Sequence, residues 1–242
     1  MLATLLDLVL PGGCAACGVA GRQSICRDCR EQVAQVPAPR RPRPAPPGLP
    51  ACIAGGDYDG AIRELVLAFK ERGRRSLARP LGDRLAEVVR AGWPGRGQFP
   101  PRGAPSAWPA AVVLVPVPAT AAAIRARHGD HMLALARRAA RRLDASGVAT
   151  VVATPLRALP RADSAHLDRE QRAAAAHTAF AVRWRAPARL AALAAVADTG
   201  AVVLVDDILT TGSTLAAAAG LLLGAGVPVT FAATLAATRR HS

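Results

Sequence analysis

The segment VVLVDDILTTGST at residues 202–214 constrains the fold of this 242-residue chain more than any other feature. Its first four residues are apolar and predict a buried central strand, which delivers Asp206 and Asp207 to its carboxyl end. Ile208 and Leu209 are expected to turn the chain into a loop, and an apolar helix is expected to follow that loop. The segment therefore predicts a strand, a loop and a helix in direct succession.

The loop of this segment has the composition of an anion-binding site. Its backbone N–H groups and the partial positive charge of the following helix would surround one point, where a 5′-phosphate fits. Glycine permits close approach of the backbone, and the neighbouring hydroxyl groups add donors. The two carboxylates would repel a phosphate, so we expect them at the hydroxyls of an attached sugar. The candidate phosphate-binding residues are Thr210, Thr211, Gly212, Ser213 and Thr214.

The segment differs from the two commonest nucleotide-binding loops. It lacks the G-x-x-x-x-G-K-[ST] pattern, and no G-x-G-x-x-G follows its strand. The ordinary alternative is a strand that ends in an Asp pair, followed by a helix with a Ser or Thr N-cap. Each part is common by itself, but the uninterrupted order of the parts favours a ligand site.

Apolar runs and helical periods alternate along the chain after residue 50. This alternation predicts an α/β protein with a parallel sheet and helices on its faces. Ligands in such sheets bind at the carboxyl ends of strands, where the strand order reverses. The expected strands are 51–56, 111–118, 148–154, 201–205 and 227–236, and the expected helices are Ala61–Phe69, Leu77–Val89, His131–Leu143 and Ser213–Leu223.

Four of the five cysteines lie within 16 residues, as two C-x-x-C pairs. Four thiolates at this spacing suit one tetrahedral zinc ion, which would be structural because the protein supplies all its ligands. Redox-active thiols and disulfides are the alternatives. Cys52 stands alone among apolar residues and is expected in the core. The candidate zinc ligands are Cys14, Cys17, Cys26 and Cys29.

The chain carries a formal net charge of +14, almost entirely through arginine, since Lys70 is its only lysine. The arginines are scattered along the chain and form no stripe, which favours a GC-rich coding sequence as their origin. The functional alternative is attraction to phosphates, either of a small ligand or of nucleic acid. Only 3% of the residues are aromatic, so few side chains are available for base stacking.

Composition divides the chain into residues 1–36, 37–50 and 51–242. The first part holds a short amphipathic helix and the cysteine-rich head, and the last part is the α/β domain with a loop at 93–109. The middle part, PAPRRPRPAPPGLP, is too proline-rich for a helix or a paired strand and predicts an extended, semi-rigid linker. No apolar run reaches the ~18 residues of a membrane span, and the start lacks the features of a signal peptide. We therefore expect a cytoplasmic protein without membrane insertion.

Residues 202–214 resemble the signature of the type I phosphoribosyltransferases, which bind 5-phosphoribosyl pyrophosphate together with Mg²⁺. The chain as a whole resembles the ComF competence-protein family. The shared features are the two C-x-x-C pairs, Tyr58-x-Gly60, Phe69-Lys70 at a helix end, VPVP at 115–118 and an arginine-rich turn before a helix. The resemblance implies a type I phosphoribosyltransferase-like parallel sheet flanked by helices, with a small N-terminal four-cysteine zinc head.

The resemblance also implies roles for individual residues. Asp206 and Asp207 would be the catalytic pair that holds the ribose hydroxyls, and residues 210–214 would bind the 5′-phosphate. The turn after VPVP would meet the pyrophosphate through arginine, whose planar group makes bidentate phosphate contacts. A solvated, basic start of a helix is the alternative for that turn. Residues 156–178 would be the loop that closes over the ligand. The residues implied at the pyrophosphate are Arg125, Arg127 and Lys70.

The chain departs from the family's usual pattern at several positions. Relatives often have Arg-Gly-Phe-Asn-Gln where residues 127–131 read Arg-His-Gly-Asp-His. In the closing loop, Ser164 stands where glutamine is common, and Ala175 stands where asparagine is common. Many relatives have a second cysteine set, whereas this chain has one. The departures fall on the pyrophosphate and closing-loop contacts and leave residues 202–214 intact.

Two main classes of function are open from the sequence. The first is an enzyme that uses Mg²⁺ and transfers a phosphoribosyl group, through an oxocarbenium-like transition state, to an unidentified acceptor. The second is a DNA-binding accessory protein in DNA uptake, with single-stranded DNA or uptake proteins as partners and a regulatory or vestigial ligand site. A redox thiol protein is a third class. The candidate bases by residue type, with ordinary surface histidines as the alternative, are His128, His131, His166 and His177.

Overall fold

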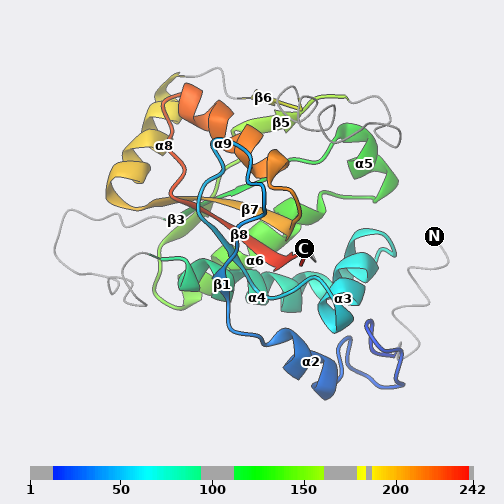
Figure 1. Cartoon of the computed structure of the whole chain (residues 1–242). Coiled ribbons are helices and arrows are strands. Elements are labelled where there is room, and N and C mark those ends of the chain that lie inside the picture. Colours follow the sequence, from blue (N-terminus) through cyan, green and yellow to red (C-terminus); the bar gives the residue numbers. More distant parts are fainter. Residues whose placement is uncertain (1–12, 94–111, 161–178, 184–186, 240–242) are drawn as a thin grey trace.

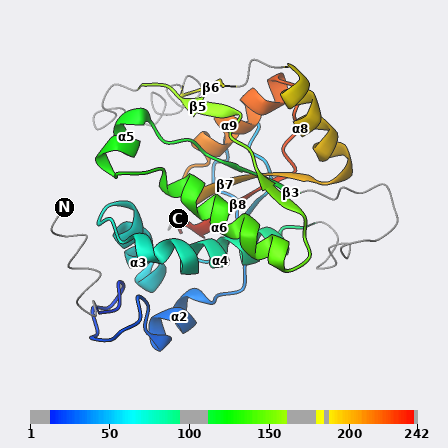
Figure 2. The same cartoon turned by 180° about the vertical axis from the view of Figure 1, so that it is seen from behind.

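A computed structural model describes residues 13–93, 112–160, 179–183 and 187–239 (Figure 1). These residues form an α/β protein in which a six-stranded, mostly parallel sheet is flanked by helices (Figure 2). Three expectations lie outside the described residues: the helix at the amino end, most of the loop at 93–109 and most of the closing loop at 156–178.

The described helices are α2 (Arg27–Val33), α3 (Gly60–Lys70), η1 (Arg75–Leu77), α4 (Ala78–Ala91), α5 (Ala121–Ala126), α6 (His131–Ala145), α8 (Pro187–Thr199) and α9 (Ser213–Gly224). Helices α3, α4, α6 and α9 confirm the predicted helices to within two residues at each end, and the other described helices were not predicted. The described strands are β1 (Ala38–Pro39), β2 (Cys52–Ala54), β3 (Val112–Pro116), β4 (Thr150–Val152), β5 (Leu156–Ala158), β6 (Phe180–Val182), β7 (Ala201–Leu209) and β8 (Phe231–Ala237). None of the helices in these parts of the chain has both the length and the apolar character needed to cross a bilayer.

The strand order places a topological switch at the centre of the sheet. The order is β1-β2-β8-β7-β3-β4. In this spatial order, every neighbouring pair except β1-β2 runs parallel. The chain passes from β3 outward to β4, and from β7 in the opposite direction to β8. The order therefore reverses between β3 and β7, which pair as far as Pro116↔Val205. Ligands of open parallel sheets bind outside the carboxyl ends of strands at such a point.

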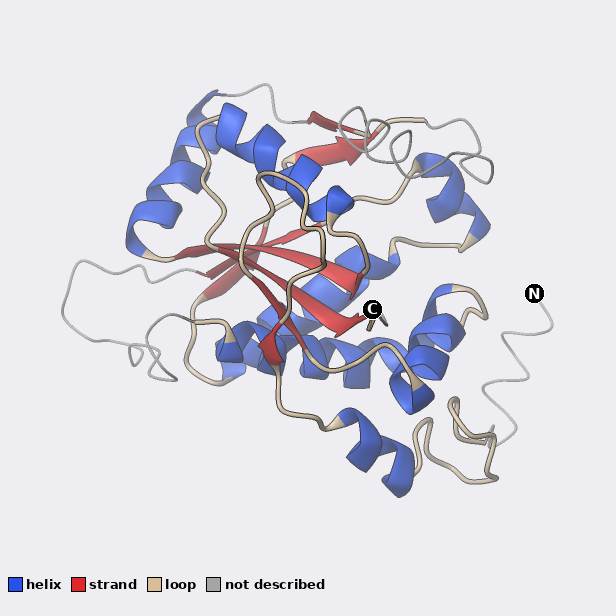
Figure 3. Ribbon diagram, viewed as in Figure 1, coloured by secondary structure: helices blue, strands red, loops and turns tan. Residues whose placement is uncertain are grey.

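The alternating side chains of the strands divide the core into two layers. Val203 and Val205 pack with α3, α4 and α6 on one face of the sheet. Val202 and Leu204 pack with α8 and α9 on the other face. Both layers are visible in Figure 3, where helices lie above and below the red strands. A strand buried on both faces needs apolar side chains in both directions, which explains the continuous apolar run of β7.

β7 is longer than the sequence predicted. We expected a strand at 201–205 and a turn at Ile208 and Leu209, but the strand continues to Leu209 and pairs there with Ala237. The predicted turn is wrong because β8 runs equally far and offers hydrogen-bond partners to the additional residues. The two aspartates therefore lie in the last part of the strand and not after it.

The proline-rich segment also differs from its prediction, because part of it pairs with the sheet. β1 lies antiparallel to β2, with Ala38 opposite Ala54, and the N–H of Arg40 donates to the Cys52 carbonyl at 2.9 Å. Proline is tolerated here because one side of an edge strand needs no backbone donors. Further along, Leu49 packs into the core layer that contains α9.

The cysteine-rich head packs directly against the rest of the described protein. Cys14, Ile25 and Cys29 belong to the core layer of α3 and α4, and α2 lies against α3. Arg74, which follows α3, donates to the carbonyl of Gly13 at 2.9 Å. The head is therefore fastened to the helix whose last residue is Lys70.

Candidate functional site

Asp206 and Asp207 lie at the carboxyl end of β7 and belong to opposite faces of the sheet. Side chains alternate along the strand, so Asp207 lies on the same face as Val205, toward α3 and α6. Asp206 lies on the same face as Leu204. Asp207 is buried, whereas Asp206 is partly exposed. The backbone N–H of Asp207 donates to Asp206 Oδ1 at 2.9 Å, which ties the two residues together.

Two side chains from different helices reach one oxygen of Asp207. Lys70 Nζ, at the end of α3, lies 2.6 Å from Asp207 Oδ2. His131 Nε2, at the start of α6, lies 3.5 Å from the same oxygen. The resemblance implied Lys70 at the pyrophosphate, and the structure brings it to a carboxylate 137 residues away in the chain.

His131 is the site residue that sequence reasoning did not single out among the four histidines. Its helical spacing to Leu135 and Ala139, which are both fully buried, places it on the inward face of α6. That spacing is the signal that separates His131 from a surface histidine. α6 begins at this residue because Asp130 caps the helix, accepting the N–H of Leu133 at 3.0 Å.

The pKa values of the two carboxyl groups are shifted in opposite directions. Although Asp206 is partly exposed as a residue, burial of its carboxyl group and the negative charge of Asp207 raise its pKa above the usual range. Burial would also raise the pKa of Asp207, but the hydrogen bonds and charges of His131 and Lys70 outweigh it and hold that pKa below its usual range. The pair therefore carries its negative charge chiefly on Asp207.

The loop after β7 makes a sharp entry into α9. Gly212 has a φ of 78°, in the left-handed region that glycine adopts without strain. Thr211 Oγ1 lies 3.0 Å from Ser213 Oγ and accepts the N–H of Ser213 at 3.4 Å. Helix geometry leaves the other first-turn N–H groups of α9 without an intrahelical acceptor. The loop thus offers N–H and hydroxyl donors to an anion, in the order of elements that the sequence predicted.

Part of the proline-rich segment packs against this loop. A Cβ atom on Gly212 would lie 2.9 Å from Leu49 Cδ2 and 3.3 Å from Pro42 Cγ. Leu49 is 8% exposed and packs in the layer that also contains Leu209 and Leu215. The segment that the sequence identified only as a linker therefore limits the space beside the candidate phosphate loop.

The turn after β3 carries the arginines implied at the pyrophosphate. Arg125 is exposed in α5, and Arg127 Nη2 pairs with Glu71 Oε1 at 3.0 Å. Arg75 donates to the carbonyl of His128 and so holds this turn to the segment after α3. Among the described residues, no hydrogen bond or ion pair joins either arginine to the carboxylates of β7 or to the loop before α9.

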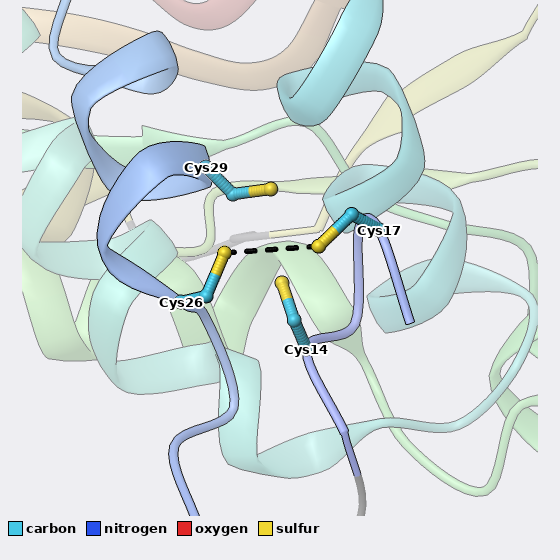
Figure 4. A group of neighbouring side chains, drawn as sticks. All are labelled: Cys14, Cys17, Cys26 and Cys29. Atoms are coloured by element: carbon cyan, nitrogen blue, oxygen red, sulfur yellow. Dashed lines mark hydrogen bonds between the residues drawn. The ribbon is translucent and has the colours of Figure 1, made fainter. Parts of the chain in front are cut away.

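Cys14, Cys17, Cys26 and Cys29 converge in the head (Figure 4). Their Sγ atoms all lie within 4.8 Å of one another, and those of Cys17 and Cys26 are 3.7 Å apart. Tetrahedral zinc with Zn–S bonds of about 2.3 Å requires sulfur atoms roughly 3.8 Å apart. None of the four forms a disulfide. The four thiols can therefore hold a metal ion such as zinc, while Cys52 lies in the core as predicted.

The backbone around Cys14 favours its thiolate, the form that binds metal. Burial would raise the pKa of this thiol, but hydrogen bonds from the backbone of Cys17, Cys26 and Ala16 outweigh it and lower the pKa. Metal binding requires deprotonated thiols, so these N–H groups favour the metal-binding form of Cys14, whereas burial raises the pKa of Cys29.

Comparison with known proteins does not assign the chain to a family. No protein-family model matches the chain, and no curated protein matches it. The molecule itself has a mostly parallel sheet flanked by helices. A pair of carboxylates and a donor-rich loop lie at the switch point of that sheet, and a four-cysteine cluster lies near the amino end.

Proposed function

We propose that this protein binds 5-phosphoribosyl pyrophosphate with Mg²⁺ at the carboxyl ends of β3 and β7, and transfers its phosphoribosyl group to an acceptor. The observation that carries the proposal is the succession of Asp206, Asp207 and a donor-rich loop where the strand order reverses. The resemblance of residues 202–214 to the type I phosphoribosyltransferase signature, and of the chain to the ComF family, supports the same ligand.

The proposed ligand fits the order of groups along β7 and its loop. The loop at 210–214 suits the 5′-phosphate, because it presents donors at the amino end of α9. Asp206 and Asp207 suit the ribose hydroxyls, because they precede the loop and would be repelled by the phosphate itself. The side chain of Leu49 limits the space at the phosphate end of this site.

Transfer would break the bond between ribose C1 and a pyrophosphate oxygen, and an acceptor nucleophile would form the new bond at C1. Positive charge develops on the ribose in such a transition state, so the ionised carboxylate of Asp207 stabilises it. Mg²⁺ bound with the ligand would supply positive charge to the pyrophosphate oxygens. Arg125 and Arg127 follow β3 and would bind the pyrophosphate, Arg127 by exchanging Glu71 for phosphate oxygens.

Calorimetric titration of 5-phosphoribosyl pyrophosphate with Mg²⁺ into the full chain tests the proposal. We expect saturable binding that becomes about 100-fold weaker or undetectable in Asp206→Asn/Asp207→Asn, because the ribose hydroxyls lose their charged acceptors and meet amide groups instead. Asp28→Asn, which removes an exposed carboxylate of α2, is the control and should bind normally.

Retained affinity in the double variant, or no binding by a folded and metal-loaded sample, would contradict the proposal. A steeply salt-dependent affinity for single-stranded DNA in that second case would favour the DNA-binding accessory protein.

We propose zinc as the metal of the four-cysteine cluster. Four sulfur donors in tetrahedral spacing suit zinc, and ligands such as these exclude Mg²⁺ from the head because Mg²⁺ prefers oxygen. All four positions would be filled by the protein, so the ion would stabilise structure and would have no open position for substrate.

A further inference from the structure

Among the described residues, both basic partners of Asp207 approach the same carboxylate oxygen. Lys70 Nζ and His131 Nε2 both approach Oδ2, at 2.6 and 3.5 Å. Within the described parts of the chain, neither ion pair involves Oδ1. Two donors on one oxygen fix the rotation of the carboxylate, and they leave the lone pairs of Oδ1 for another donor.

His131 makes this contact from a largely buried position, where its ring has no other polar partner in the described parts of the chain. Its side chain is 10% exposed, and its ring meets Phe69 edge-on with the centroids 6.5 Å apart. Its second nitrogen, Nδ1, is buried and has no hydrogen-bond partner among the described residues. A buried nitrogen without a partner costs free energy, so packing alone would favour an apolar side chain here. What the imidazole adds is the contact with Asp207.

We propose that His131 is a positioning residue, which together with Lys70 orients Asp207 so that Oδ1 accepts a hydroxyl of a sugar ligand. The inference rests on the proposed function for the identity of the ligand, whereas the contacts with Oδ2 belong to the free protein. The charged and titratable groups that face Asp207 are Lys70 from α3 and His131 from α6, and Asp206 precedes it on β7 and interacts with it electrostatically. Of these, His131 can be replaced without removing a carboxylate or the lysine.

Two variants of matched length separate positioning from packing. His131→Gln keeps an N–H donor at about the reach of Nε2, whereas His131→Met keeps the length and removes the donor. In calorimetric titrations with 5-phosphoribosyl pyrophosphate and Mg²⁺, we expect the methionine variant to bind about tenfold or more weakly. The glutamine variant should stay within about threefold of the unaltered protein.

Thermal unfolding of the same variants distinguishes positioning from a structural role. The midpoint of His131→Met should not fall, because the substitution removes the buried, unpaired Nδ1. Loss of stability with intact affinity in His131→Met would overturn the inference.

A measurement without ligand keeps the inference separate from the proposed function. The carboxyl carbon of Asp207 is titrated by NMR and assigned by its disappearance in Asp207→Asn. We expect the pKa of Asp207 to rise in His131→Met, because a donor to its charged form is lost, and to stay low in His131→Gln. An unchanged titration in His131→Met would overturn the inference. If the unaltered protein binds no ligand but this titration shifts, the proposed function fails and the orienting role of His131 stands.

Discussion

At the scale of single residues, Gly212 is constrained both by its backbone and by its neighbours. Its φ is 78° and an added Cβ would meet Leu49, whereas Gly226 has the same φ and nothing within 4 Å of such an atom. Gly226→Ala should therefore lower the free energy of unfolding by about 1–2 kcal/mol through backbone strain alone. Gly212→Ala should lose about 1–3 kcal/mol more, because Leu49 must move. Urea unfolding of both variants measures the difference, and equal losses would show that Leu49 does not confine the loop.

At the scale of elements, α4 and α6 approach each other closely at a glycine. An added Cβ on Gly82 would lie 2.6 Å from Arg138 Cβ, so the helices would have to separate, and Arg138 also pairs with Asp83 at 2.8 Å. We expect Gly82→Ala to lower the free energy of unfolding by about 1–3 kcal/mol. Gly220→Ala in α9, where the space is open, should raise it by about 0.5–1 kcal/mol through helix propensity. Denaturant titrations check both signs, and a stabilised Gly82→Ala would contradict the close approach.

The elements also show which parts of the fold follow from the sequence. Helices α3, α4, α6 and α9 and the parallel strands follow from apolar periodicity, which is a local property of the chain, whereas α2, α5 and α8 were not predicted. The full length of β7 and the pairing of β1 depend on partners distant in sequence, β8 and β2, which local patterns do not reveal. The same holds for the candidate site: the aspartates and the loop were found from residues 202–214, but the approach of Lys70 and His131 to Asp207 required the fold.

At the scale of the whole molecule, the cysteine cluster belongs to the main core. Cys14 and Cys29 are each 4% exposed and pack in the layer of α3 and α4. Removal of the metal by a chelator, or Cys14→Ser, should therefore lower the unfolding midpoint of the entire protein by about 5 °C or more. Scanning calorimetry with metal analysis checks this, and Cys52→Ala, outside the cluster, should keep its metal. A separate small transition that leaves the main midpoint unchanged would show that the head unfolds independently.

The ion pair between Lys70 and Asp207 has a consequence for chemical labelling. Lys70 is the only lysine of the chain, and 26% of its side chain is exposed beside the candidate site. A reagent that acylates side-chain amines therefore has a single target in the sequence. The carboxylate partner shields that amine, so the rate of its acylation reports how firmly α3 and β7 are held together. The composition of the chain thus provides a reporter at the candidate site without any engineered group.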